Sequence, residues 1–280
     1  MMKIRETSSE KFDIIIVAGQ SNASGCGMGK TTTPWIPDDK IMMFNERFTA
    51  EVVSTSYGDM LEIETTGDCF LTVADERGEN DDKMAVFALS FAKKYAENNL
   101  AEDRKVLLVQ TAIGGTGFAR KHWGVDEKLE KRMYKMVDSA LSMNKENRVV
   151  GIVWHQGEHD IYENGDLDYN ARYAFYMEKL STFIKRLRKK YGELPFVSGG
   201  FCNGWISEQN QDNVKAIKDV YKDLYEKTSK VKHVWETEDL KSNSEVVKGS
   251  ADNVHFSREA CYELGRRYYE KFSEIIKENE

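Results

Sequence analysis

The sequence alternates short runs of branched apolar residues with longer segments of helical period, and this alternation constrains the fold more than any other feature. The apolar runs predict strands at residues 13–18, 40–44, 105–110, 149–154, 195–198 and 232–235. The periodic segments predict helices near residues 84–98, 127–141, 167–190, 207–229 and 257–276. Because several of the strands are apolar along most of their length, we expect a mostly parallel sheet with helices on both sides.

The length of the chain fits one domain of this kind. Its 280 residues, 40% of them hydrophobic, supply enough apolar surface for one large core, so we expect a single α/β domain over residues 1–280. Residues 19–83 are rich in Gly, Thr and Asp and predict a long loop insertion after the first strand. Open α/β sheets bind ligands at the carboxyl ends of their strands, so this insertion is expected to shape the pocket.

Charge and cysteine content disfavour several classes of function. A formal net charge of −7 argues against a general nucleic-acid binder. No apolar run approaches the ~20 residues that cross a bilayer, and the N-terminus is charged up to Asp13, without a signal-peptide core. We therefore expect a cytoplasmic protein that binds neither nucleic acid nor membrane. Cys26, Cys69, Cys202 and Cys261 lack zinc-ligand spacing and are expected to be reduced, mostly buried thiols.

A histidine-rich segment follows the fourth predicted strand. Residues 155–159 read HQGEH, which has the spacing with which some zinc hydrolases place two histidines on one helix face. The residues directly before it, however, form a predicted strand, and Gly157 is a poor helix residue. A zinc-dependent hydrolase that uses His155 and His159 therefore stays an alternative, not the main interpretation.

A second set of residues suits a serine esterase. Ser21, Gly115 and Gln156 each follow a predicted strand, and Asp252 and His255 lie three apart before the last helix. The carboxyl ends of parallel strands meet at one edge of a sheet, so one crevice could hold all five. A histidine activates a serine hydroxyl by taking its proton, and a carboxylate orients that histidine. The N–H groups of Ser21 and Gly115 and the amide of Gln156 could stabilise an oxyanion.

The order of four motifs resembles that of the SGNH hydrolases, in the branch of sialate O-acetylesterase domains and acetylxylan-esterase-like carbohydrate esterases. The motifs are GQSN at 19–22, AIGGT at 112–116, WHQGE-x-D at 154–160 and D-x-x-H at 252–255. The resemblance implies a flavodoxin-like three-layer α/β/α fold. It also implies a serine esterase, without cofactor or metal, that removes O-acetyl groups from carbohydrates such as acetylated xylo-oligosaccharides or sialic acids.

The resemblance implies roles for individual residues as well. Ser21 would be the nucleophile and His255 the base. Asp252 is the expected acid partner of His255, and Glu158 is a second carboxylate expected near that histidine. The chain departs from the usual family pattern at Ala23 and at His159, two positions where the acyl group or the sugar could be touched.

The sugar-binding residues are less specific predictions. Gln20, Asn22 and His159 are expected to contact substrate. Three tryptophans, Trp35, Trp123 and Trp205, are candidate platforms for a sugar ring. A catalytically silent carbohydrate-binding protein on the same fold is a further alternative, because a fold does not determine function.

Overall fold

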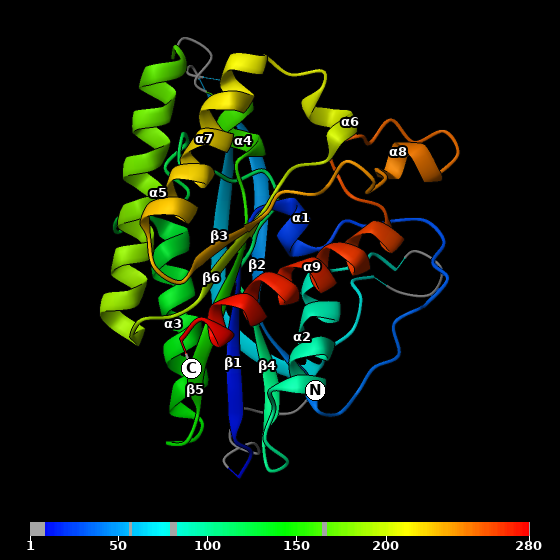
Figure 1. Cartoon of the computed structure of the whole chain (residues 1–280), viewed down its shortest axis with the longest axis vertical. Coiled ribbons are helices and arrows are strands. Elements are labelled where there is room, and N and C mark those ends of the chain that lie inside the picture. The colour runs from blue at the N-terminus through cyan, green and yellow to red at the C-terminus, as the bar shows by residue number, and fades with distance from the viewer. Residues whose placement is uncertain (1–8, 56–57, 79–82, 164–166, 280) are drawn as a thin grey trace.

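The predicted apolar runs all form strands, and these strands lie in one sheet (Figure 1). The computed structural model describes residues 9–55, 58–78, 83–163 and 167–279, so residues 1–8 of the N-terminal prediction lie outside the described part. The strands are β1 (Phe12–Gly19), β2 (Ile41–Thr55), β3 (Gly58–Val73), β4 (Lys105–Gln110), β5 (Arg148–His155), β6 (Phe196–Gly199) and β7 (Val231–Val234). Their order is β3-β2-β4-β1-β5-β6-β7, with all neighbours parallel except β2 and β3. The mostly parallel sheet is confirmed.

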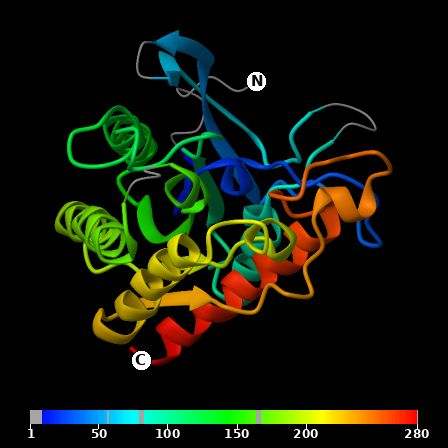
Figure 2. The ribbon, with the colours of Figure 1, turned by 90° about the horizontal axis from the view of Figure 1, so that it is seen from above.

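Helices cover both faces of this sheet (Figure 2). Helices α2 (Phe87–Asn98) and α9 (Arg258–Lys277) lie on one face, and α3 (Lys128–Ser142), α5 (Tyr169–Tyr191) and α7 (Gln211–Lys227) lie on the other. Successive residues of a strand face opposite layers: Ile14 packs with the α3 side, and Ile15 packs with the α2 side. The three-layer α/β/α sandwich is therefore confirmed. Within the described part of the chain, no helix is both long and apolar enough to span a bilayer.

The expected loop over residues 19–83 is largely a β-hairpin, so that prediction is wrong over most of β2 and β3. Strand β2 pairs with β3 along its whole length but with β4 only over Ile41–Phe44. Among the described residues, the outer part of the hairpin therefore has no third strand beside it, and Figure 2 shows it projecting from the sheet. Its sequence mixes polar and apolar residues and lacks the continuous apolar run of a strand that is buried on both faces.

The topology places three strand ends together. Strand β1 lies between β4 and β5, and the chain builds the sheet first on the β4 side and then on the β5 side. Such a reversal leaves a crevice at the carboxyl ends of the central strands, where open α/β sheets bind ligands. The residues after β1, β4 and β5 are those that the sequence analysis singled out. Short helices follow or border these ends: α1 (Ser21–Ser24), α4 (Glu158–Tyr162), α6 (Asn203–Ile206) and α8 (Asn243–Val246).

A buried carboxylate stabilises the opposite end of the sheet. Asp13 in β1 has no exposed side-chain area and accepts hydrogen bonds from Arg104 Nε (2.7 Å), Arg148 Nε (2.7 Å) and the Tyr95 hydroxyl (2.8 Å). Burial raises the pKa of Asp13, but the hydrogen bonds from Arg148, Tyr95 and Arg104 outweigh it, and the net pKa lies below its ordinary value. The folded state therefore favours the ionised carboxylate.

We expect Asp13→Asn to lower the free energy of unfolding by about 3 kcal/mol at neutral pH, because the variant leaves two guanidinium groups without their shared anion. A lowered folded-state pKa contributes stability above the unfolded value of about 3.9, and this is lost as pH falls through the folded-state pKa. The difference between wild type and variant should therefore be constant near neutral pH and shrink below about pH 4. Urea unfolding at a series of pH values measures it. Asp103→Asn, at an exposed carboxylate paired with Lys11, is the control; an equal loss there would contradict the assignment.

Candidate active site

The chain turns sharply from β1 into α1, and this turn places Ser21 at the sheet edge. Gly19 ends β1 with φ +124°, and a Cβ at this position would lie 2.0 Å from the carbonyl oxygen of His155. Only glycine permits this approach. The Gln20 N–H donates to the same carbonyl at 2.8 Å. Ser21, the first residue of α1, is thereby held against the end of β5.

The backbone N–H groups of Ser21 and Gly115 have no hydrogen-bond acceptor among the described residues. A Cβ on Gly114 would lie 3.4 Å from the Cβ of Ser21, so the turn after β4 packs directly on the serine. Gly115 in this turn has φ +70°. In the described part of the chain, neither the Ser21 N–H nor the Gly115 N–H has a hydrogen-bond acceptor, and the Ser21 hydroxyl, in a residue 9% exposed, has no partner. N–H donors without acceptors can stabilise the negative charge that develops on a substrate oxygen in the transition state.

His255 pairs with Asp252 across a short turn. His255 Nδ1 lies 2.9 Å from Asp252 Oδ2, and the His255 N–H donates to Oδ1 at 3.2 Å. Asn243, which no sequence signal singled out, donates from Nδ2 to Asp252 Oδ2 at 2.8 Å. Burial raises the pKa of Asp252, but the hydrogen bonds from His255 and Asn243 outweigh it and hold the pKa below its ordinary value. An ionised acceptor at Nδ1 leaves Nε2 of His255 as the basic nitrogen.

Asn22 joins the segment that carries Ser21 to residues 252–256, which form the histidine loop. Its Oδ1 accepts from the Phe256 N–H at 3.2 Å, and its Nδ2 donates to the Val254 carbonyl at 3.1 Å. These two backbone groups flank His255, and Asn22 directly follows Ser21. The structure therefore brings Ser21 and His255 onto adjacent segments, although no hydrogen bond joins their side chains. Catalytic hydrogen bonds of this kind are often long in the absence of substrate.

Glu158 lies deeper than Asp252 and contacts a different histidine. Its side chain is 2% exposed; Oε1 accepts from Asn22 Nδ2 at 2.8 Å and lies 3.3 Å from His155 Nε2. Burial raises the pKa of Glu158, but His155 and the Asn22 hydrogen bond outweigh it, and the net pKa is lowered. Within the described residues no contact joins Glu158 to His255. Glu158 therefore reaches the histidine loop only through Asn22.

The side-chain amide of Gln156 is hydrogen-bonded to other protein groups. Its side chain is fully buried; Nε2 donates to Asp160 Oδ2 at 2.7 Å and to Gln20 Oε1 at 3.1 Å, and Oε1 accepts from the Tyr176 hydroxyl at 2.8 Å. Both amide hydrogens thus have acceptors, and the geometry does not favour the expected oxyanion role. Burial raises the pKa of Asp160 to about 6, although Gln156 and two backbone N–H groups donate to it.

The three residues expected to bind substrate differ in their surroundings. Asn22 uses its polar atoms on protein partners, as described above. Gln20 accepts at Oε1 from Gln156 and from the His159 N–H, but among the described residues its Nε2 has no partner. His159 is partly exposed, and its Nε2 has no hydrogen-bond partner. Burial lowers the pKa of the His159 imidazole. Gln20 therefore keeps a polar atom without a partner among the described residues, whereas the unpaired Nε2 of His159 is buried and only other parts of that residue are exposed.

A cavity of about 310 Å³ opens beside the serine turn. Gly114, Ala112 and Ile113 form one wall, and Met43, Asn45 and Phe48 of β2 belong to another. Arg77 also lines this cavity and donates from Nη1 to the Gly25 carbonyl at 3.0 Å. The hairpin that replaces the expected loop thus contributes directly to a cavity that reaches the neighbour of Ser21.

The zinc interpretation required His155 and His159 on one helix, and the structure contradicts this arrangement. His155 is the buried last residue of β5, while His159 lies in α4. Gly157 separates them with φ +144°, outside the helical region. Within residues that the structure describes, no group of three or more His, Cys, Asp or Glu side chains is placed to hold a metal. The four cysteines are free thiols as expected, although only Cys202 and Cys261 are buried.

A family model described as "carbohydrate esterase, sialic acid-specific acetylesterase" (SASA) matches residues 11–274, nearly the whole chain. The chain belongs to the SASA family. This membership makes the protein a carboxylic ester hydrolase of the carbohydrate esterase type, and the expected family is confirmed. No match to the chain is found among curated proteins.

Solved structures share the fold of this SASA-family esterase. NanS is 18% identical with a TM-score of 0.70, over 96% of this chain and 99% of NanS. A protein from Arabidopsis thaliana is 20% identical with a TM-score of 0.64, over 94% of this chain and 98% of that one. A carbohydrate acetylesterase from Xanthomonas citri is 12% identical with a TM-score of 0.53, over 95% of this chain and 56% of that one. At these identities the similarity establishes the fold alone.

Proposed function

We propose that this esterase removes O-acetyl groups from carbohydrates through an acetyl ester on Ser21. The observation that carries the proposal is the set of groups around the serine. His255, paired with Asp252, is held on the segment beside Ser21 by Asn22, and the N–H groups of Ser21 and Gly115, without acceptors among the described residues, belong to the two turns that meet at the serine. The acetyl group follows from the description of the family, and an acetylated xylo-oligosaccharide or sialic acid is the proposed substrate type.

The proposed reaction has two halves. His255 Nε2 takes the hydroxyl proton of Ser21 while Oγ bonds to the acetyl carbonyl carbon, and the N–H groups of Ser21 and Gly115 donate to the oxyanion. The C–O bond to the sugar then breaks, and His255 returns the proton to the departing sugar oxygen. In the second half, water gives a proton to His255 Nε2 and its oxygen bonds to the carbonyl carbon of the acetyl-serine. The bond between that carbon and Ser21 Oγ then breaks, His255 returns the proton to Oγ, and acetate leaves. Asp252 orients the imidazole and stabilises its charged form in both halves.

Buried residues support these groups in the proposal. Glu158 holds Asn22, and Asn22 holds the two peptide groups around His255. Gln156 holds the side-chain oxygen of Gln20 in place. These residues act by positioning, whereas Gln20, through its Nε2, and the exposed part of His159 are the proposed contacts for substrate. The cavity beside Gly114 is the proposed site for the acetylated ring.

The tryptophans divide into three environments. Trp123 is 1% exposed and packs edge-on against Trp154 in the core, so it cannot be a sugar platform, and that prediction is wrong. Trp205 is partly buried and lies against Phe201. Trp35 is partly exposed and lies at a different cavity, which is described below.

Intact-mass measurement during turnover of an aryl acetate tests the proposal. We expect a transient adduct with the mass of one acetyl group, located to the peptide that contains Ser21, because the acyl-enzyme is a covalent intermediate. Protein treated with excess chelator should keep its full activity. Loss of activity on chelation, restored by zinc, would favour the zinc-dependent alternative. Sugar binding without acetate release or adduct would favour the silent binding protein.

A further inference from the structure

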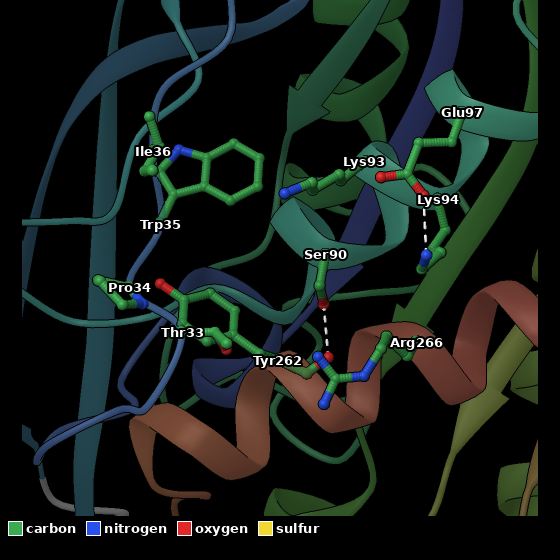
Figure 3. A pocket seen from close by; sticks show the side chains of 10 residues that line it. All are labelled: Thr33, Pro34, Trp35, Ile36, Ser90, Lys93, Lys94, Glu97, Tyr262 and Arg266. Carbon is green, nitrogen blue, oxygen red and sulfur yellow. Dashed lines mark hydrogen bonds and ion pairs between the residues drawn. The ribbon is translucent and has the colours of Figure 1, made fainter.

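A second cavity, of about 280 Å³, lies between the loop before β2 and helices α2 and α9 (Figure 3). It is lined by Trp35 from the loop, by Lys93 and Lys94 from α2 and by Tyr262 and Arg266 from α9. None of the active-site residues described above lines it. Its volume is close to the lower end of the range for small-molecule sites, which suits a single sugar ring.

Two aromatic residues give this cavity a fixed apolar wall. The Trp35 Nε1–H donates to the Ala74 carbonyl at 2.9 Å, which fixes the plane of the indole, and the rest of the ring faces the cavity (Figure 3). The Tyr262 hydroxyl donates to the buried carboxylate of Glu76, so its ring is fixed as well. A rigid aromatic face binds the C–H face of a pyranose ring at little cost in conformational entropy.

Three cationic side chains line the cavity in a protein whose net charge is −7, and one of them has no ion-pair partner among the described residues. Lys94 pairs with Glu97 at 2.7 Å, and Arg266 pairs with Glu263 at 2.6 Å. Lys93 is exposed and has no acidic partner among the described residues. Figure 3 shows its ammonium group on the side of the cavity that faces Trp35. An ammonium without a partner beside a fixed aromatic ring suits a ligand that carries both an apolar face and an anionic group.

A further hollow continues past the tryptophan. It shares Trp35, Ile36 and Lys93 with the first cavity and is also lined by Asp38 and Asp39. Carboxylates accept hydrogen bonds from sugar hydroxyls, and the exposed Ile36 (79%) adds apolar surface between the two hollows. A simple anion would use only Lys93, whereas a saccharide of more than one ring would use the whole surface.

We propose that these two hollows form a non-catalytic binding site for an acidic saccharide, in which a carboxylated pyranose stacks on Trp35 and its carboxylate pairs with Lys93. The site is separate from Ser21 and does not depend on the proposed esterase mechanism. In a carbohydrate esterase it would hold a distant part of a charged glycan chain and so increase the effective concentration of that chain at the enzyme.

The test uses two sugars that differ in one group: methyl α-D-glucuronide and methyl α-D-glucoside. The indole N–H signal of Trp35 in a ¹H–¹⁵N spectrum, assigned by its loss in Trp35→Phe, reports binding. We expect the glucuronide to shift this signal at a concentration about tenfold lower than the glucoside, because a charge-assisted hydrogen bond contributes to the first alone. Lys93→Gln should remove the preference, and Lys185→Gln, on α5 across the sheet, should leave it unchanged.

Three results would overturn this proposal. They are an unchanged Trp35 signal in saturating glucuronide, equal binding of the two sugars, and an equal shift by inorganic phosphate, which would indicate a general anion site. Two further measurements separate this proposal from the esterase mechanism. Ser21→Ala should keep glucuronide binding, and Lys93→Gln should keep the wild-type rate on an aryl acetate.

Discussion

Ser21→Ala is expected to lower kcat/KM for an aryl acetate by roughly 10³-fold to 10⁶-fold. The variant lacks the oxygen that would carry the acetyl group, while the N–H groups of Ser21 and Gly115 remain and could support only slow hydrolysis by water. Because the hydroxyl has no hydrogen-bond partner in the described part of the chain, its removal should not destabilise the fold. Steady-state release of the aryl alcohol measures the loss, and thermal unfolding checks that the variant is folded.

Ser24→Ala is the matched control for this experiment. Ser24 lies in the same short helix; its hydroxyl donates to the Ser21 carbonyl at 3.1 Å and accepts from Arg77 Nη1 at 3.3 Å. Its loss should lower kcat/KM by about tenfold at most, since no catalytic step uses this oxygen and a hydrogen bond contributes about 1 kcal/mol. A folded Ser21→Ala variant with wild-type turnover would refute the acyl-serine mechanism, whatever the behaviour of Ser24→Ala.

The second large effect is expected at Asp252, the carboxylate that is hydrogen-bonded to His255. Asp252→Asn is expected to lower kcat by about 10²-fold to 10⁴-fold with little change in KM, because an amide neither stabilises the imidazolium nor holds the Nδ1–H tautomer. Asp252 lies 2.9 Å from Nδ1, and its lowered pKa keeps it ionised in the pH range where the base works. Measurement of kcat and KM from pH 5 to 9 gives the loss at each pH.

Glu158→Gln is the comparison that separates the two carboxylates. A glutamine can still accept the hydrogen bond from Asn22 Nδ2, so the histidine loop should stay in place and kcat should fall by about tenfold at most. If Glu158 were the principal partner of His255, the larger loss of kcat would be that of the Glu158 variant. The Asp252→Asn variant would then keep most of its activity, while a folded Glu158→Gln variant would lose it.

The sequence predicts those elements that are buried on both faces. Strand β4 matches its predicted range because Leu107 and Val109 face one helix layer while Val106 and Leu108 face the other, which produces an unbroken apolar run. The first residues of β2 were predicted, but the rest of β2 and all of β3 were not, because that part of the hairpin pairs only with itself. Periodicity reports burial against a layer, and most described side chains of the outer hairpin are exposed, Ile63 being an exception.

The candidate site shows the same division. The pairing of Asp252 with His255 is predictable because only two residues of chain separate them, and the placement of Ser21 and Gly115 follows from the topology of a parallel sheet. The hydrogen bonds of Asn22 to Val254 and Phe256 were not predictable, because they join residues that lie far apart in the sequence. The hydrogen bonds of the Gln156 amide were not predictable either, since the sequence does not show that Asp160 accepts one of its hydrogens.

The two hydrogen bonds that Asn22 forms with the peptide groups around His255 have a consequence for the synthesis of the protein. During translation the ribosome delivers Ser21 more than 200 residues before His255. Until residues 252–256 emerge and dock, the amide of Asn22 has no peptides to hold, and the serine has no base. A shortened chain that ends before residue 252 would be inert toward esters, and hydrolysis would begin only when residues 252–256 close onto the sheet edge.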